Sequence, residues 1–305
     1  MSHRTQGGGA GHRGVHHDVT PASGERQDPS FRSTDESMSA PAHHGAGRST
    51  WKAVAIPSEH GGWGLTAEPI LLGLLLAFSW PGVAIGVAAM CAFLARTPLK
   101  LALVDRRRGR ELQRTVLARR IGLAEVAAIV AMGVVALIAA GWEWLIPAAI
   151  ALPLFAIELW YDIRSRGRRL VPELCGAIGM GAVAAAIVVA GDGAATLAAA
   201  AWLVLAARSI GAIPFIRTQI DRLHHGTVST HPSDLFQLLA LVVAVIAAVV
   251  DPDVVVGSIA VAVIVVLHLV WVRRSPVPPA KVLGLRQMAL GVALVAATAA
   301  GVRLS

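Results

Sequence analysis

Nine apolar runs follow one another along the chain from residue 64, and each is about 16–22 residues long. This repetition constrains the fold more than any other feature, because a helix needs about 20 predominantly apolar residues to cross a bilayer. Helices also pair every backbone polar group internally, as a bilayer requires. The sequence predicts an all-α, polytopic bundle of about nine transmembrane helices, over residues 64–80, 82–104, 121–141, 144–160, 173–190, 194–216, 235–250, 254–272 and 283–301.

One predicted span contains polar interruptions. Arg96, Pro98 and Lys100 fall in the last third of the run at 82–104. We therefore expect that third to reach the membrane interface, with the two cationic side chains extending toward water.

Residues 1–50 differ from the rest of the chain in composition. They contain only ten apolar residues, with Phe31 as the single aromatic residue, whereas the whole chain is 55% apolar and 15% charged. The whole-chain values exclude an ordinary soluble enzyme. The first segment cannot bury enough apolar surface to offset the entropy of ordering it. The sequence predicts a disordered cytoplasmic tail over residues 1–50 and a transmembrane helical domain over residues 51–305.

The formal net charge of +8 would normally indicate a nucleic-acid partner. The positions of the charges indicate the lipid bilayer instead. Eighteen Lys and Arg residues lie in alternate connections or in the adjoining end of a run, and the intervening connections contain none. Because cytoplasmic loops are enriched in Lys and Arg, we expect a multi-pass protein of the cytoplasmic membrane with its amino terminus inside, its carboxyl terminus outside and no nucleic-acid partner.

Ionisable residues inside the apolar runs are candidates for function, because a charge in the membrane is costly unless it is paired or hydrated. Glu68, Glu125 and Glu173 lie near predicted helix starts, where they either complement the helix dipole or serve a site. Glu158 and Arg208 have no such explanation. They are expected either to pair with one another or to face a wet cavity.

The predicted depth of these residues suggests one shared site. All lie in the cytoplasmic half of the bundle or in the adjoining loops, and a single hydrated pocket costs less than scattered buried charges. An anionic head group would be held by Arg166 and Arg217 while its tail lies between helices. No catalytic residue is assigned. The predicted substrate-binding residues are His60, Glu68, Glu158, Asp162, Arg166, Glu173, Arg208, Arg217 and Asp221.

Two further segments contain histidines. Residues 56–64 place His60 beside glycines and Trp63, which indicates either an interfacial anchor or a ligand contact. His224, His225 and His231 share a loop without a matching set of carboxylates, so no metal site is predicted there.

Residues Pro57-Ser58-Glu59-His60-Gly61-Gly62-Trp63, followed by Pro69 and Gly73, resemble the opening of the YwiC-like family of bacterial integral membrane proteins. Leu283-Gly284-Leu285-Arg286-Gln287 is also similar to that family, so the resemblance extends over residues 52–303. It implies a multi-pass protein of the bacterial cytoplasmic membrane, and it implies topology and not a particular chemistry.

A more distant resemblance concerns Tyr161-Asp162-Ile163-Arg164-Ser165-Arg166 with Pro172 and Gly176, which is similar to the fifth helix of UbiA-type prenyltransferases. That resemblance implies a UbiA-like bundle of about nine helices with a cytoplasmic active site. In the superfamily, two acidic motifs hold magnesium against a prenyl diphosphate.

The corresponding positions depart from those acidic motifs. The first offers Asp105 and Glu111, which are about 240° apart on a helix, and the second offers only Asp221. No cofactor is evident, and Mg²⁺ is expected only if a degenerate prenyltransferase-like site is active. Basic side chains could still hold a phosphate directly.

Two classes of function remain open. The first is a protein that binds or modifies an isoprenoid- or lipid-type amphiphile with an anionic head in a cytoplasm-facing cavity; as an enzyme it would be a degenerate UbiA-like transferase. The alternative is a membrane transporter or a non-enzymatic accessory protein, because intramembrane Glu and Arg also serve proton relays and gates. The missing acidic motifs favour the alternative, and the absence of an evident internal repeat with broken helices disfavours a transporter.

Overall fold

The computed structural model describes residues 60–107, 109, 113–164, 167 and 169–305, all of which belong to one unit, residues 44–305. This part of the chain contains nine α-helices, one short 3-10 helix and no strand, so the predicted all-α class is confirmed. The predicted tail, residues 1–50, lies outside the described residues. The helices are α2 (His60–Leu76), α3 (Trp80–Arg107), α4 (Gln113–Ala140), α5 (Leu145–Ile163), α6 (Leu170–Ala190), α7 (Ala195–His225), α8 (His231–Val250), η1 (Pro252–Val254), α9 (Val255–Trp271) and α10 (Ala280–Leu304).

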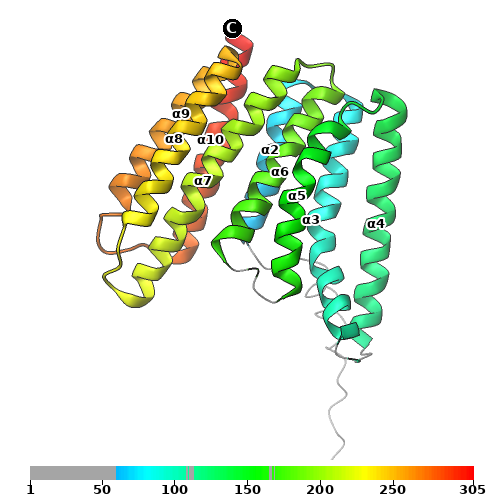
Figure 1. Cartoon of the computed structure of the whole chain (residues 1–305), viewed down its shortest axis with the longest axis horizontal. Helices are drawn as coiled ribbons and strands as arrows, with labels where there is room; N and C mark the ends of the chain where they lie inside the picture. Colours follow the sequence, from blue (N-terminus) through cyan, green and yellow to red (C-terminus); the bar gives the residue numbers. More distant parts are fainter. Residues whose placement is uncertain (1–59, 108, 110–112, 165–166, 168) are drawn as a thin grey trace, which may run out of the picture. The chain divides into compact units, whose positions relative to one another are not determined.

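Consecutive helices alternate in direction (Figure 1). The connections α3–α4, α5–α6, α7–α8 and α9–α10 lie at one end of the bundle, together with the start of α2. We call this the basic end, because the Lys and Arg clusters lie in those connections and in the helix segments that adjoin them. The short connections without Lys or Arg lie at the opposite end, together with Ser305. The alternation on which the charge count rested is therefore present in the structure.

Several helices are longer than the apolar runs that predicted them. α4 begins at Gln113 and not at 121, and α7 ends at His225 and not at 216. Both extensions contain several arginines, which favour helix even though they are not apolar. The short runs at 144–160 and 235–250 are helices long enough to span a membrane: α5 has 19 residues and α8 has 20.

The interior of the bundle is built from small residues. Most of the membrane-spanning part of α6 and of α7 is buried, and the buried positions are largely Ala and Gly. Small side chains allow helix backbones to approach closely, which is how membrane helices gain packing energy without a hydrophobic driving force. α6 packs against α2, α3, α5 and α7, and α7 packs against α8 and α9.

The outer helices present apolar side chains outward. α4 packs mainly against α3 and exposes Val130, Val134 and Ile138. Eight of the described helices are long and apolar enough to cross a membrane, and α2 adds the shorter apolar segment Trp63–Leu76. The protein is therefore a multi-pass membrane protein whose outer faces contact lipid.

Exposed tryptophans lie at two levels of the bundle. Trp80 and Trp142 are at the opposite end, and Trp63 and Trp160 are at the basic end. Tryptophan is enriched at both membrane–water interfaces. The two pairs therefore agree with a membrane interface at each end of the bundle, with Trp160 near the one at the basic end.

Candidate functional site

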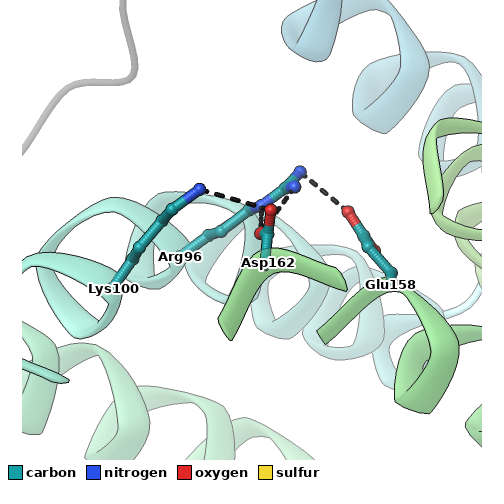
Figure 2. Close-up of polar contacts among 4 residues, drawn as sticks. All are labelled: Arg96, Lys100, Glu158 and Asp162. Carbon is teal, nitrogen blue, oxygen red and sulfur yellow. Dashed lines mark hydrogen bonds and ion pairs between the residues drawn. The ribbon is translucent and has the colours of Figure 1, made fainter. Parts of the chain in front are cut away.

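A cluster of two cations and two carboxylates bridges α3 and α5 near the basic end (Figure 2). Both helices pack against α6, and long side chains span the space between them. Arg96 and Lys100 are four residues apart on α3, and Glu158 and Asp162 are four residues apart on α5. Residues with that spacing share one face of a helix, so each helix presents a pair of like charges to the other.

The contacts within the cluster are short. One terminal guanidinium nitrogen of Arg96 lies 2.8 Å from Glu158 Oε1, and the other lies 2.8 Å from Asp162 Oδ2. Arg96 Nε donates to the same Asp162 oxygen at 3.1 Å, and Lys100 Nζ donates to Asp162 Oδ1 at 3.2 Å. The prediction that Arg96 and Lys100 merely extend toward water was therefore incomplete, because acids on α5 fix the positions of both head groups.

The members of the cluster differ in exposure. The side chains of Arg96 and Lys100 are 44% and 49% exposed, whereas those of Glu158 and Asp162 are 16% and 9% exposed. The carboxylates thus lie beneath the cations. A ligand that approaches the cluster meets positive charge that is already oriented from below, which favours an anion.

A groove of about 160 Å³ adjoins the cluster. Its polar lining is Arg96, Lys100, Arg107 and Asp162, and its other walls are Leu99, Leu103, Val104, Leu159 and Ile163. Arg107 donates to the backbone carbonyl of Ile163 at 3.4 Å, which joins the two helices at the basic end. Trp160, in the neighbouring turn of α5, stacks with the Arg164 guanidinium 3.7 Å from its ring centroid. The groove therefore combines cations, apolar walls and an interfacial depth.

Two glycines leave room for the acidic side of the cluster. A Cβ at Gly176 of α6 would lie 2.6 Å from the Glu158 carboxylate. A Cβ at Gly167, in the connection between α5 and α6, would overlap the Asp162 carboxylate. No real Cβ contact is that short, so glycine at these positions allows the carboxylates to sit where they do.

A second polar site lies deeper in the bundle, between α2 and α7. Glu68 and Arg208 are both buried; Arg208 Nε lies 3.0 Å from Glu68 Oε2, and a terminal guanidinium nitrogen donates to Glu68 Oε1 at 3.0 Å. The same nitrogen donates to the backbone carbonyl of Gln287 at 2.7 Å. The pair satisfies the condition for charge in a membrane, because each ion has its counter-ion.

Polar side chains continue from this pair through α10, α9 and α8. Gln287 Nε2 lies 2.9 Å from His268 Nε2, and His268 Nδ1 lies 3.3 Å from Gln237 Oε1. Gln237 Nε2 donates to the carbonyl of Gly211 at 2.8 Å, and the His268 ring stacks on Phe215 at 4.2 Å. Since Gln237 Oε1 accepts, the Nδ1 nitrogen of His268 carries the proton. Five helices are therefore connected by one buried polar network.

The remaining predicted site residues lie elsewhere. Glu173 and Arg217 form an ion pair of 2.9 Å between α6 and α7, and Asp221 is exposed on the last turns of α7. Arg166 and the side chain of His60 lie outside the described residues. The prediction of one shared pocket is therefore wrong for the described residues, because they lie in three separate parts of the bundle.

Of the two alternatives for Glu158 and Arg208, pairing with one another is wrong. Glu158 contacts Arg96 and Arg208 contacts Glu68, because α5 and α7 lie on different flanks of α6.

The dipole explanation holds for one of the three acids near predicted helix starts. Glu173 lies in the first turn of α6. Glu125 lies twelve residues into α4, because that helix begins earlier than predicted, and Glu68 lies eight residues into α2. Neither of these two contacts the unpaired N–H groups of a helix start.

In the part of the chain that the structure describes, no three His, Cys, Asp or Glu side chains gather as a metal site. His224 and His225 each place Nδ1 near a backbone carbonyl of the preceding turn. Asp105 accepts from Thr115 at 2.6 Å and lies 3.6 Å from Arg114 Nε, while Glu111 lies outside the described residues.

Sequence reasoning did not identify Arg96, Lys100, His268, Gln237 or Gln287 as site residues. Each of the five is a polar residue inside an apolar run, and this feature could have identified them. The prediction considered mainly buried acids and Arg208, and it treated cations near a run's end as anchors.

Residues 56–189 match the model of the family described as YwiC-like protein. No curated protein and no solved structure matches the chain. The matched range includes the groove between α3 and α5 and also Glu68, whereas Arg208 and the residues of α8 to α10 lie beyond it. The resemblance at Leu283–Gln287 and the UbiA-like resemblance stay predictions. Over residues 56–189 the chain is similar to the YwiC-like family, and its long apolar helices are those of a multi-pass membrane protein.

Proposed function

We propose that this protein binds an amphiphile with a phosphate-type anionic head, such as a lipid or isoprenoid phosphate, in the groove between α3 and α5. The observation that carries the proposal is the layered cluster: half-exposed Arg96 and Lys100 lie above nearly buried Glu158 and Asp162. The groove also lies at the level of Trp160, where lipid head groups are found.

The chemistry of the groove suits such a ligand. The guanidinium of Arg96 and the ammonium of Lys100 can donate charge-assisted hydrogen bonds to phosphate oxygens. Arg107 supplies a third cation at the mouth, and Leu99, Leu103 and Leu159 provide walls for the first part of a tail. Glu158 holds Arg96 from outside the groove lining, whereas Asp162 holds both cations and lines the groove beside them.

The proposal is binding. Prenyl transfer of the UbiA type would require acids that hold a metal, and here Arg96 and Lys100 engage Glu158 and Asp162 directly. The proposal does not require Mg²⁺. If the head group binds directly to Arg96 and Lys100, added Mg²⁺ competes with these side chains for the head group and weakens retention of the lipid.

The proposed placement is the cytoplasmic membrane of a bacterium with the basic end in the cytoplasm. The support is the position of 18 Lys and Arg residues in the connections and adjoining helix segments at that end, whereas the connections at the opposite end contain none. The groove would then open to the cytoplasmic leaflet, whose anionic lipids attract basic surfaces.

Native mass spectrometry of the detergent-purified protein tests the proposed binding. Wild type should retain phosphatidylglycerol, or a co-purified prenyl phosphate, in preference to phosphatidylcholine. Arg96→Gln and Lys100→Gln should each weaken retention of the anionic lipid by about tenfold, the loss expected for a charge-assisted hydrogen bond.

Arg273→Gln is the matched control. Arg273 is also a half-exposed arginine at the basic end that pairs with an aspartate, Asp234, at 2.9 Å, but it lies just after α9 and does not line the groove. Its variant should retain the lipid as wild type does. Equal retention by all three variants would contradict the proposal.

A transporter is the second candidate, and the Glu68–Arg208 pair favours it. Ion pairs buried deep in a membrane mark substrate or proton pathways in many transporters, and this pair continues into a polar network across five helices. Proteoliposomes containing a pH-sensitive dye should then show protein-dependent proton flux that Glu68→Gln abolishes. Absence of flux in wild type counts against this candidate.

A further inference from the structure

A second groove lies between α2 and α10, on a different side of α6 and α7 from the cationic groove. Its volume is about 290 Å³ and its exposed surface is entirely apolar. Glu68 forms part of the floor, but its carboxylate faces Arg208 and not the groove. The lining residues are Trp63, Gly64, Ala67, Glu68, Leu71, Leu75, Met288, Val292, Val295 and Ala296.

The groove runs along the two helices, which are parallel and both begin at the basic end. From Trp63 to Leu75 is twelve residues of α2, or about 18 Å along its axis. One leaflet contributes about 15 Å to the apolar layer of a bilayer. The length of the groove is therefore close to the thickness of the apolar layer of one leaflet. The groove starts at an interfacial tryptophan, Trp63.

The hollow results from particular small residues. Gly64 and Ala67 on α2 and Ala296 on α10 line it, while exposed Leu71, Met288 and Val292 form its lipid-facing rims. Gly291 lets α10 approach the Glu68 carboxylate, because a Cβ there would overlap it. The floor is consequently closed by a satisfied ion pair, which leaves no polar group for a ligand to contact.

A cation lies beyond the basic-end mouth of the groove. Lys281 is exposed and is seven residues before Met288, which places it on the same face of α10 about 10 Å closer to the basic end. Gly284, between them, has open space around its Cβ position. A head group above the mouth would thus meet positive charge and no obstructing side chain.

We infer that this groove is a seat for one chain of an anionic phospholipid from the leaflet at the basic end, with its head group near Lys281. The seat is separate from the groove between α3 and α5, and it shares no residue with it. A lipid bound there covers the junction of α2 and α10 directly above the Glu68–Arg208 pair.

Photocrosslinking of the full chain in nanodiscs tests this seat. The probes are phosphatidylglycerol and phosphatidylcholine with a diazirine near the end of one acyl chain, and labelled residues are mapped by mass spectrometry. Labelling at Leu71, Leu75 and Val292, which lie farther from the basic end, should exceed labelling at exposed Val242 and Val263 on α8 and α9 several-fold. Phosphatidylglycerol should label about fivefold more than phosphatidylcholine, and Lys281→Gln should remove that preference.

Variants that fill the groove complete the test. Ala67→Phe and Ala296→Phe fill the hollow from opposite walls. Each should abolish the excess labelling, so one variant that folds is enough for the test. Val242→Phe, on an outer face, should leave it unchanged. Equal labelling of groove and outer-face residues in wild type would overturn the inference, as would persistence of the excess in a filled variant.

Discussion

Glu68 and Arg208 carry opposite charges on two helices that meet inside the bundle, and both side chains are buried. Desolvation of each ion is costly, and the cost is offset by the partner and by the carbonyl of Gln287. A pair of this kind contributes little net stability as a unit. Loss of one partner, however, leaves the other ion buried and uncompensated.

We therefore predict that Glu68→Leu alone destabilises the protein by about 3–5 kcal/mol. The double variant Glu68→Leu/Arg208→Met should lose much less, because no charge then remains buried. Thermal unfolding in detergent, followed by the loss of monodisperse protein, measures both. A double variant as unstable as the single variant contradicts this account of the pair.

The sequence predicted which charged residues belong to this site, but not which of them contact one another. Glu68 and Arg208 were recognised because a charge inside an apolar run is expensive. The partner of Arg208 depends on which helices are neighbours, and no local pattern in the sequence encodes that. Gln237 and Gln287 are neutral and therefore cheaper to bury, so they gave a weaker signal.

At the scale of helices, hydrophobicity predicted the position of each helix but not every residue at which a helix begins or ends. The number of helices and their order follow from the apolar runs, because membrane thickness sets the minimum length. The start of α4 and the end of α7 were missed because arginine-rich segments remain helical outside the apolar layer. This matters for the cationic groove, since α3 also continues past its apolar run to Arg107.

The junction of α2 and α10 gives a prediction at this scale. Gly291→Ala should lower thermal stability, because the added methyl would overlap the Glu68 carboxylate and separate the two helices. Gly284→Ala, seven residues earlier on the same helix, meets open space and should be neutral or gain up to about 1 kcal/mol from helix propensity. Melting curves of the two variants should move apart, and equal shifts would show that this contact is not close-packed.

At the scale of the molecule, loop charge predicted the alternation of helices, whereas the packing order could not be read from the sequence. In a membrane both lipid-facing and interior faces are apolar, so hydrophobic periodicity does not identify the buried face. The weak distinction that remains is residue size: α6 and α7 are rich in Ala and Gly and form the interior. The separation of the predicted site residues into three places follows from that order.

Orientation in the membrane gives a prediction for the whole chain. With the basic end in the cytoplasm, an alkaline phosphatase fused after Ser305 should be active and a fluorescent protein that folds only in the cytoplasm should be dark there. Fusions after Arg274, in the connection between α9 and α10, should show the reverse. Activity of the phosphatase at Arg274 and not at Ser305 would invert the proposed orientation.

The central claim is that Arg96 and Lys100 hold an anionic head group. Its most direct measurement is an electron cryo-microscopy map of the full chain in nanodiscs containing phosphatidylglycerol. The account predicts phosphate density about 3 Å from the Arg96 guanidinium and the Lys100 ammonium, with Glu158 and Asp162 still beneath them. A map in which this groove contains only lipid chains, with lipid phosphates elsewhere, would contradict it.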